Sequence, residues 1–349
     1  MAVPQHILAL RFSALGDVAM TVPVLKLLLQ QYPNLEITLV SAPFHKPLFT
    51  GIDRLHFYGA DIKKDFKGAK GLYNLSQRLK KDIAFDAVAD LHDVLRTKII
   101  RKFLPGATAV INKGRKQKKE LTRAKNKKLR PLKTSFERYA DVFEKLGYPI
   151  KLLRRQGIVH LHANDTLLDV PRSGYKFIGI APFAKHASKT YPLEKMKLVV
   201  ELLQQKPGMQ ILLFGSRDEA PILQDWKGNF DNVTVIAGRY AFEDELNIIS
   251  QLHLMVSMDS ANMHLASLYG VPVVSVWGGT HPYLGFYGWG QDIDNAVQLT
   301  LDCRPSSVFG NKPCPVHGVA GCMQGISPQM IVDKTEGVLT KLMKPIGAE

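Results

Sequence analysis

The chain has 349 residues, which is long enough for two domains of about 150 residues each. Hydrophobic residues make up 46% and charged residues 22%, a globular composition that excludes global disorder. The net charge of +15 favours a polyanionic partner, and nucleic acid, an anionic membrane surface or a phosphorylated substrate would each satisfy it.

The apolar stretches are strand-sized, and none approaches the roughly 20 residues that a bilayer-spanning helix needs. The N-terminus does not resemble a signal peptide, because no basic segment precedes the apolar run of residues 6–10. Beyond this run, the charged residues Arg11 and Asp17 interrupt the apolar character of the chain. We therefore expect a cytoplasmic protein.

Short, continuous runs of Val, Ile and Leu recur along the chain, with helix-like stretches between them. Such runs are typical of strands in a parallel sheet that helices cover on both faces. The predicted strands are Ile7–Leu10, Glu36–Val40, Asp86–Leu91, Thr108–Ile111, Phe177–Ala181, Gln210–Phe214, Val233–Ala237, Leu254–Ser257 and Val271–Val276. The pattern occurs twice, so we expect an α/β fold of two Rossmann-like domains that face each other across a cleft.

The polar stretch His160–Gly174 is the predicted hinge between the domains. The predicted domains are residues 1–165 and 166–330, followed by a C-terminal segment of residues 331–349. A helix over Ser327–Leu342 is indicated by a Ser-Pro start and by apolar residues at helical spacing. One arrangement open to this helix is packing back on the N-terminal domain.

The turn after the first predicted strand contains Ser13, Gly16 and Asp17. Gly16 permits a tight turn and leaves room for a substrate to approach the backbone. Asp17 falls near a helix N-terminus, where the partial positive charge stabilises a carboxylate by about 0.3–1 kcal/mol. Local sequence by itself favours a helix-capping role for Asp17. A G-x-G-x-x-G dinucleotide motif is absent from the sequence, which argues against an ordinary dehydrogenase.

A strongly basic run extends from Lys113 to Lys133 and contains a single acidic residue, Glu120. Two interpretations carry nearly equal weight. The run is either a solvated surface loop or a clamp for an anionic partner, to which Lys113, Arg115 and Lys116 would contribute.

The second half contains two further motifs at strand-to-helix transitions. Lys189 precedes a helix start at Pro192, where it could reach a phosphate together with helix amides, although an ordinary surface lysine is the simpler interpretation. The run from Ser257 to Ala266 follows a strand and opens a helix. There Asp259, Ser260 and the first helical amides form a natural pocket for phosphate or sugar hydroxyls. His264 lies one turn further on, and packing under the loop is its alternative role.

Together these motifs resemble glycosyltransferase family nine, the lipopolysaccharide heptosyltransferases. That family has an S-x-G-D-like turn, a K-x-W-P-like helix start, a D-S/T-G/A-x-x-H-L-A motif and a G-x-T-x-P loop, here Gly278 to Pro282. A cysteine-bearing tail is common in its members. The chain departs from the family pattern at Tyr191, Gly279 and His281, where tryptophan, proline and aspartate are frequent. The last two positions bear on the identity of the donor sugar.

The resemblance implies a glycosyltransferase-B fold whose N-terminal domain binds a lipid-linked acceptor and whose C-terminal domain binds a nucleotide-sugar, typically ADP-heptose. It implies an inverting transfer that needs no obligatory cofactor or metal. Asp17 would be the catalytic base, and Ser13 and Gly16 would lie beside the acceptor. The implied donor-binding residues are Lys189, Glu219, Tyr240, Asp259, Ser260, Ala261 and His264. The expected partners are the nucleotide-sugar, an anionic saccharide acceptor and the cytoplasmic face of the inner membrane, with no specific nucleic acid.

Two alternatives of other classes remain open. One is a nucleotide-sugar epimerase of similar two-domain fold. The other is a basic nucleic-acid-binding protein, although no recognisable nucleic-acid module is present and aromatic residues do not interleave with the basic run.

The cysteines are few, and an odd number argues against a disulfide framework. Cys303, Cys314, His317 and Cys322 could be imagined as a zinc site. Only Cys314 and His317 have the tight spacing of metal ligands, however, so the spacing predicts unmetallated structural cysteines.

Overall fold

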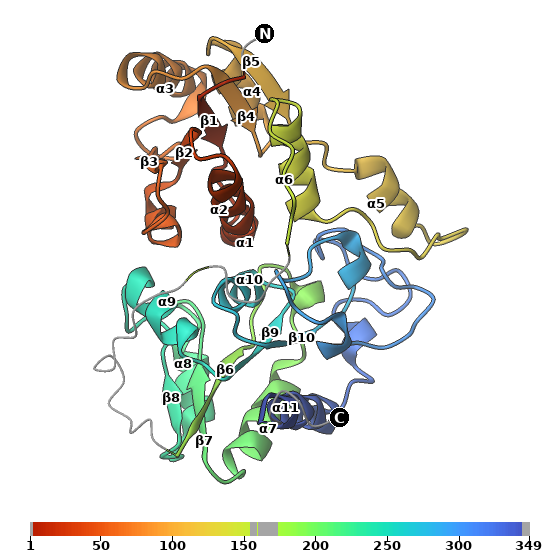
Figure 1. Ribbon diagram of the computed structural model, residues 1–349. Helices are drawn as coiled ribbons and strands as arrows, with labels where there is room; N and C mark the ends of the chain where they lie inside the picture. The colour runs from red at the N-terminus through yellow and green to blue at the C-terminus, as the bar shows by residue number, and fades with distance from the viewer. Residues whose placement is uncertain (1–2, 154–158, 160–173, 344–349) are drawn as a thin grey trace. The chain divides into compact units, whose positions relative to one another are not determined.

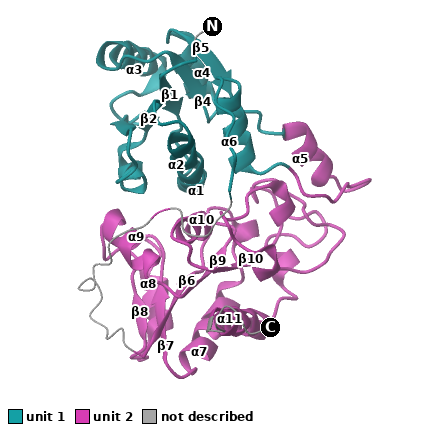
Figure 2. Cartoon of the chain, in the orientation of Figure 1, with its two compact units in different colours: residues 1–114, 133–154 teal, residues 115–132, 155–349 magenta. Residues whose placement is uncertain are grey.

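The computed structural model describes residues 3–153, 159 and 174–343, which form two compact α/β units (Figure 2). The first unit comprises residues 1–114 and 133–154, and the second comprises residues 115–132 and 155–349. Residues 160–173 of the predicted hinge lie outside the described residues. The sequence did not indicate that residues 115–132, within the basic run, belong with the second unit.

The first unit contains a five-stranded parallel sheet with the strand order β3-β2-β1-β4-β5. The strands are β1 (His6–Leu10), β2 (Glu36–Ser41), β3 (Leu55–Gly59), β4 (Ala87–Asp90) and β5 (Ala107–Val110). The four predicted strands of this half are confirmed. Sequence analysis missed β3 because it is an edge strand whose side chains are partly exposed, so it lacks a continuous apolar run.

The helices of the first unit are α1 (Leu15–Ala19), α2 (Thr21–Gln31), α3 (Gly68–Asp82), α4 (Leu95–Lys102) and α6 (Ser135–Glu144). A capping box defines the start of α6, where the Thr134 side chain accepts from the Glu137 amide and the Glu137 carboxylate accepts from the Thr134 amide. Helix α6 packs against α2 and carries the buried Tyr139. It thereby supplies a side chain to the turn that follows β1.

The second unit contains a six-stranded parallel sheet with the strand order β11-β10-β9-β6-β7-β8. The strands are β6 (Lys176–Ala181), β7 (Met209–Leu213), β8 (Val233–Val235), β9 (Leu254–Met258), β10 (Val273–Val276) and β11 (Ala296–Val297). The five predicted strands of this half are confirmed. The added edge strand β11 has two residues, too few to leave a sequence pattern.

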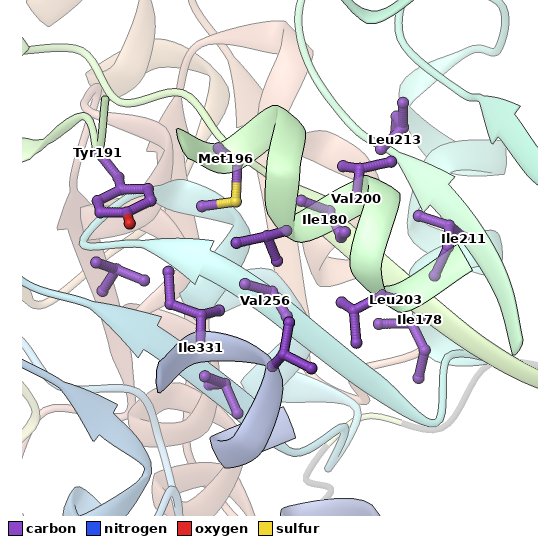
Figure 3. Packing of buried hydrophobic residues seen from close by; sticks show 14 of the residues in the cluster. Ile178, Ile180, Tyr191, Met196, Val200, Leu203, Ile211, Leu213, Val256 and Ile331 are labelled. Carbon is purple, nitrogen blue, oxygen red and sulfur yellow. The ribbon is translucent and has the colours of Figure 1, made fainter. Parts of the chain in front are cut away.

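The helices of the second unit are α5 (Arg115–Leu121), α7 (Leu193–Gln204), α8 (Ala220–Lys227), α9 (Phe242–Ser250), α10 (Ala261–Leu268) and α11 (Pro328–Met343). In Figure 3, side chains of α7, including Met196 and Leu203, pack over those of β6 and β7, and Ile331 of α11 joins the same core. Helix α11 therefore packs beside α7 within the second unit (Figure 1). Packing of this segment on the N-terminal domain stays a prediction.

The middle of the basic run is anchored to the second unit. Lys118 is buried, and its ammonium group lies 4.1 Å from the centre of the Phe286 ring, within the range of a cation–π interaction. Leu121 and Leu132 pack with Leu284 in a small apolar cluster. The solvated-loop interpretation is therefore incomplete, because part of this segment is fixed by apolar contacts.

Within the described ranges, no helix combines the length and the apolar character that crossing a bilayer requires.

Candidate functional site

In the first unit, Asp17 forms an ion pair with a buried arginine. The Asp17 carboxylate lies 2.9 Å from the guanidinium of Arg11, and the same guanidinium donates to the carbonyl of Leu91 over 2.7 Å. Leu91 follows β4 and Arg11 follows β1, and these two strands are neighbours in the sheet. The ion pair therefore lies at the carboxyl ends of the strands where the chain order of the sheet reverses, the usual location of ligand sites in such folds.

Burial opposes the charge of Arg11, but the attraction of Tyr139 and of Asp17 outweighs it and raises the pKa of Arg11. The ring of Tyr139 lies 5.7 Å from the guanidinium carbon, and its hydroxyl donates to the backbone carbonyl of Asp17 over 3.2 Å. Asp17 itself stays partly exposed, with 37% of its side-chain surface accessible. A charged arginine and a buried tyrosine thus hold a carboxylate that solvent can still reach.

The predicted acceptor residues do not all belong to one unit. Ser13 is exposed and Gly16 is half-buried, and both belong to the turn that contains Asp17. Lys113 also belongs to the first unit, where its ammonium donates to the Asp93 carbonyl over 3.2 Å. Arg115 and Lys116 are exposed and begin α5 of the second unit. Ser13 and Gly16 thus share one turn with Asp17, and Lys113 belongs to the same unit.

In the second unit, the predicted donor residues Lys189 and Asp259 are in contact. The Lys189 ammonium lies 2.9 Å from the Asp259 carboxylate, which also accepts a hydrogen bond of 2.8 Å from the Thr280 hydroxyl. Lys189 follows β6, Asp259 follows β9 and Thr280 follows β10. Because β6 and β9 are adjacent, this contact marks the switch point of the second sheet.

The N-terminus of α10 opens beside this ion pair. Ser260 is the N-cap residue, but its side chain makes no capping hydrogen bond and instead lies 3.1 Å from the Ser257 hydroxyl. Ala261 is the first helical residue, and His264 is buried one turn further along the helix. The first amides of such a helix have no intrahelical partner and favour an anion.

A loop from the C-terminal region supports Lys189. Gly310 adopts a left-handed backbone conformation (φ +72°), and a Cβ atom there would lie 2.3 Å from Cγ of Lys189. The buried guanidinium of Arg304 donates to the carbonyls of Gly278 and Thr280 over 2.5 and 3.0 Å. The glycine-rich loop and the Lys189 side chain are therefore both held by residues 304–310.

Glu219 and Tyr240 lie in neighbouring loops of the second unit. The Glu219 carboxylate accepts from the Ser216 amide over 2.6 Å and closes the turn that precedes α8. Tyr240 follows β8, and the Arg239 guanidinium lies 5.8 Å from its ring. A Cβ at Gly238 would lie 2.9 Å from the Arg217 backbone, so the loops after β7 and β8 are in contact. All of the predicted donor residues thus lie in loops or a helix start after strands of one sheet.

Two departures from the family pattern have structural explanations. His281, where aspartate is frequent, accepts a hydrogen bond of 3.1 Å from the Tyr283 amide and caps the short helix Pro282–Leu284. An aspartate would serve as the same kind of cap. Tyr191, where tryptophan is frequent, is fully buried and donates to the Ile326 carbonyl over 2.7 Å. Tryptophan also has one ring donor, so both substitutions keep a hydrogen-bonding role.

Sequence reasoning missed several residues that build these sites. Arg11 begins the first motif but was assigned no role, although an arginine directly after an apolar strand is a local signal. Thr280 lies in the G-x-T-x-P loop, and the sequence indicated no role for it. Tyr139, Arg304 and Gly310 are distant in sequence from their partners, and no local pattern indicates them.

Comparisons with known proteins agree with this arrangement. Residues 72–313 match the model of the family described as glycosyltransferase family 9 (heptosyltransferase). Lipopolysaccharide heptosyltransferase 3 of Escherichia coli K12 is 23% identical over 286 residues, which cover 76% of this chain and 80% of that protein.

Two solved structures show the same fold. A family 9 glycosyl transferase from Veillonella parvula gives a TM-score of 0.73 at 17% identity and covers 97% of this chain and 98% of its own. E. coli heptosyltransferase WaaC with ADP gives a TM-score of 0.68 at 19% identity and covers 95% of this chain and 99% of its own.

Two buried histidines beside the first site predict a pH dependence of stability. Burial, with the charge of Arg11, lowers the pKa of His92 to about 3 and that of His45 to about 4. An unfolded histidine titrates near 6.5, so as the pH falls from about 6.5 to 4 only the unfolded chain takes up these protons. The free energy of unfolding therefore decreases as the pH falls below about 6.5.

Thermal unfolding of His92→Asn, measured between pH 4 and 7.5, should show a shallower decline than the unchanged protein. The free energy of unfolding of His92→Asn minus that of the unchanged protein should change by up to about 1.4 kcal/mol per pH unit. His56→Gln is the control, because it removes an exposed histidine of the same unit. Parallel pH profiles for His92→Asn and the unchanged protein would contradict the buried, neutral state of His92.

Proposed function

The chain belongs to glycosyltransferase family 9, the heptosyltransferase family, and on that premise we propose that it transfers a heptose from ADP-heptose to the core of lipopolysaccharide. The chain is a glycosyltransferase of two parallel-sheet units. The observation that carries the proposal is the convergence of Lys189, Asp259 and Thr280 with the N-terminus of α10 at one edge of the second sheet.

The donor diphosphate suits this edge for electrostatic reasons. Lys189 supplies a positive charge held in place by Asp259 and by the close approach of Gly310. The first amides of α10 supply donors to an anion. In our proposal Glu219 binds the ribose hydroxyls and Tyr240 lines the base pocket, while Ser260, Ala261 and His264 contact the sugar and phosphate. E. coli heptosyltransferase WaaC was solved with ADP, which supports an adenine nucleotide as the donor.

The proposed reaction inverts the anomeric centre. The acceptor hydroxyl oxygen attacks the anomeric carbon, the bond from that carbon to the diphosphate oxygen breaks, and Asp17 takes the hydroxyl proton. Arg11 and Tyr139 hold the Asp17 carboxylate for this task. The charge that develops on the diphosphate is stabilised by Lys189 and by helix amides, so we propose that the transfer step needs no metal ion.

The acceptor in this proposal is an anionic, lipid-linked saccharide, and the protein acts as a peripheral enzyme at the cytoplasmic face of the inner membrane. Ser13 and Gly16 would lie beside the acceptor, and the basic run would attract its negative charge. The anchored Lys118 leaves neighbouring basic side chains, including Arg115 and Lys116, exposed to solvent. The family match favours this function over the epimerase and over a nucleic-acid-binding protein.

Lys189→Ala should weaken ADP binding about 10- to 100-fold, because a hydrogen bond to a charged group contributes about 1.5–3 kcal/mol. Isothermal titration calorimetry with ADP measures the effect. Lys197→Ala is the matched control, since Lys197 on the same unit makes a surface ion pair with Asp225. The substitution also leaves Asp259 buried without its cation, so thermal unfolding must show that the variant is folded. Unchanged ADP affinity in a folded Lys189→Ala protein would remove Lys189 from the donor site.

Asp17→Asn should lower kcat by about 10²–10⁴, the usual contribution of general-base catalysis, while the Kd for ADP stays the same. The amide keeps the size of the side chain but lacks the basic oxygen. The exposed Asp65, also in the first unit, provides the control Asp65→Asn. Steady-state kinetics with ADP-heptose and truncated lipopolysaccharide give the rates. Near-normal kcat in a folded Asp17→Asn protein would refute its role as the base.

Replacing four exposed lysines of the basic run, Lys116, Lys119, Lys125 and Lys128, with glutamine should raise the KM for acceptor and leave the Kd for ADP unchanged. The effect should shrink as salt rises, because exposed charges are screened. The equally exposed lysines 63, 64, 67 and 70 provide a control with the same loss of charge. If acceptor kinetics and binding to anionic vesicles do not change, the exposed part of the run has no role in binding.

A further inference from the structure

Three cysteines and one histidine of the second unit gather around one point. Sequence spacing linked only Cys314 and His317, but the fold adds Cys303 and Cys322, and one donor atom from each lies within 4.8 Å of all the others. The sulfurs of Cys303 and Cys322 are 3.8 Å apart. Nδ1 of His317 lies 3.3 Å from the sulfur of Cys303, 3.9 Å from that of Cys314 and 4.0 Å from that of Cys322. All three cysteines are free thiols rather than disulfides.

The Cys303–Cys322 and Cys303–His317 separations are close to the edges of a metal-centred tetrahedron, and the other two separations, 3.9 and 4.0 Å, are somewhat longer. Bond lengths of about 2.3 Å to sulfur and about 2.0–2.1 Å to nitrogen place two sulfurs ~3.8 Å apart and a sulfur and a nitrogen ~3.5 Å apart. We propose that Cys303, Cys314, His317 and Cys322 bind one structural metal ion, Zn²⁺, in a closed Cys₃His site. Four protein donors complete the tetrahedron and leave no open position for substrate, as expected of a structural ion.

The local backbone is built to present the donors. The amide of Cys314 donates to the Gly318 carbonyl over 3.0 Å, and the Gly318 amide donates back to the Cys314 carbonyl over 2.9 Å. Gly318 closes this tight turn with a left-handed conformation (φ +70°), which places His317 beside Cys314. A Cβ at Gly321 would lie 2.7 Å from Cβ of His317, so Cys322 can follow closely.

The segment that carries the four donors has little regular structure to hold it in place. Between β11 and α11, residues 298–327 form only one short helical turn, Gly321–Met323. Their large apolar side chains include Phe309, Val316 and Val319, which are 55%, 69% and 57% exposed and therefore contribute little core of their own. Cys314 and Cys322 are buried, and near the end of the segment Met323 and Ile326 join the core of the second unit. Metal coordination supplies folding free energy where an apolar core is too small.

The donor set favours a transition metal such as Zn²⁺ over hard cations, and iron is the competing ion that metal analysis distinguishes. Thiolate and imidazole ligands suit Zn²⁺, whereas Mg²⁺ and Ca²⁺ prefer oxygen ligands. The site is separate from the chemistry proposed for Lys189 and Asp17. One consequence does rest on the proposed function: the clamped segment carries Arg304 and Gly310, which hold the glycine-rich loop and Lys189, so loss of the ion should also weaken ADP binding.

Metal content of the full chain, purified without a histidine tag, tests the site independently of activity. Mass spectrometry of the metals should find about one zinc per chain. Cys314→Ser and His317→Gln should each lose most of it, while the exposed control His56→Gln should keep it. After chelation, added Co²⁺ should restore one equivalent and give the visible absorption of tetrahedral cobalt with thiolate charge-transfer bands. Chymotrypsin cleavage after the exposed Phe309 should be faster in the chelated protein than in the zinc form.

Reduced protein that contains no stoichiometric metal and binds neither Zn²⁺ nor Co²⁺ would overturn the proposal. A disulfide between Cys303 and Cys322 in the protein as purified would do the same. One equivalent of iron in place of zinc would overturn the choice of ion. If the substituted proteins do not fold, the metal content and Co²⁺ spectrum of the unchanged chain still decide between these outcomes. If the unchanged protein contains zinc but does not bind ADP, the result counts against the proposed function and leaves the proposed metal site intact.

Discussion

The ion pair between Lys189 and Asp259 depends on the order of strands in the second sheet. It positions the lysine charge and the loops around it. Strands β6 and β9 are neighbours with Ala181 opposite Ser257, so the loops after them meet. Asp259 is nearly buried, and a buried carboxylate is stable only with its partners in place. Thr280 is one such partner, and Gly310 confines the lysine from another side. A positive charge is thereby presented beside the start of a helix, an arrangement suited to a diphosphate.

The first unit repeats the same physical arrangement with the charges exchanged. Arg11 is buried after β1 and pairs with the partly exposed Asp17, so here the carboxylate is the accessible group. In the second unit the buried member is Asp259, and Lys189 is the more exposed partner. Each sheet therefore uses a buried ion to position the opposite charge at its switch point. This difference suits a base in one unit and an anion site in the other.

Only some of the positive charges in the basic run are available to bind an anionic partner. Lys118 lies over Phe286, and the Lys127 ammonium donates to the Asp302 carbonyl over 2.9 Å, so both charges contribute to the fold of the second unit. Net charge counts these lysines together with the exposed ones. Only the exposed side chains are available to attract an anionic acceptor, and the attraction they exert is long-ranged and sensitive to salt.

The sequence by itself determined the two parallel α/β units, nine of their strands, the final helix and the motifs at three strand ends, because continuous apolar runs and helix-start signals are local. It did not determine the edge strands β3 and β11, whose residues are too exposed or too few to leave such a pattern. Tertiary structure alone decided the partners: Tyr139 for Asp17, Gly310 for Lys189, and Cys303 and Cys322 for His317. The first two pairs are set by where distant loops meet at the edge of a sheet, and local sequence carries no signal for such contacts. The cysteines and His317 lie in one irregular segment, and spacing alone does not show how it folds back on itself.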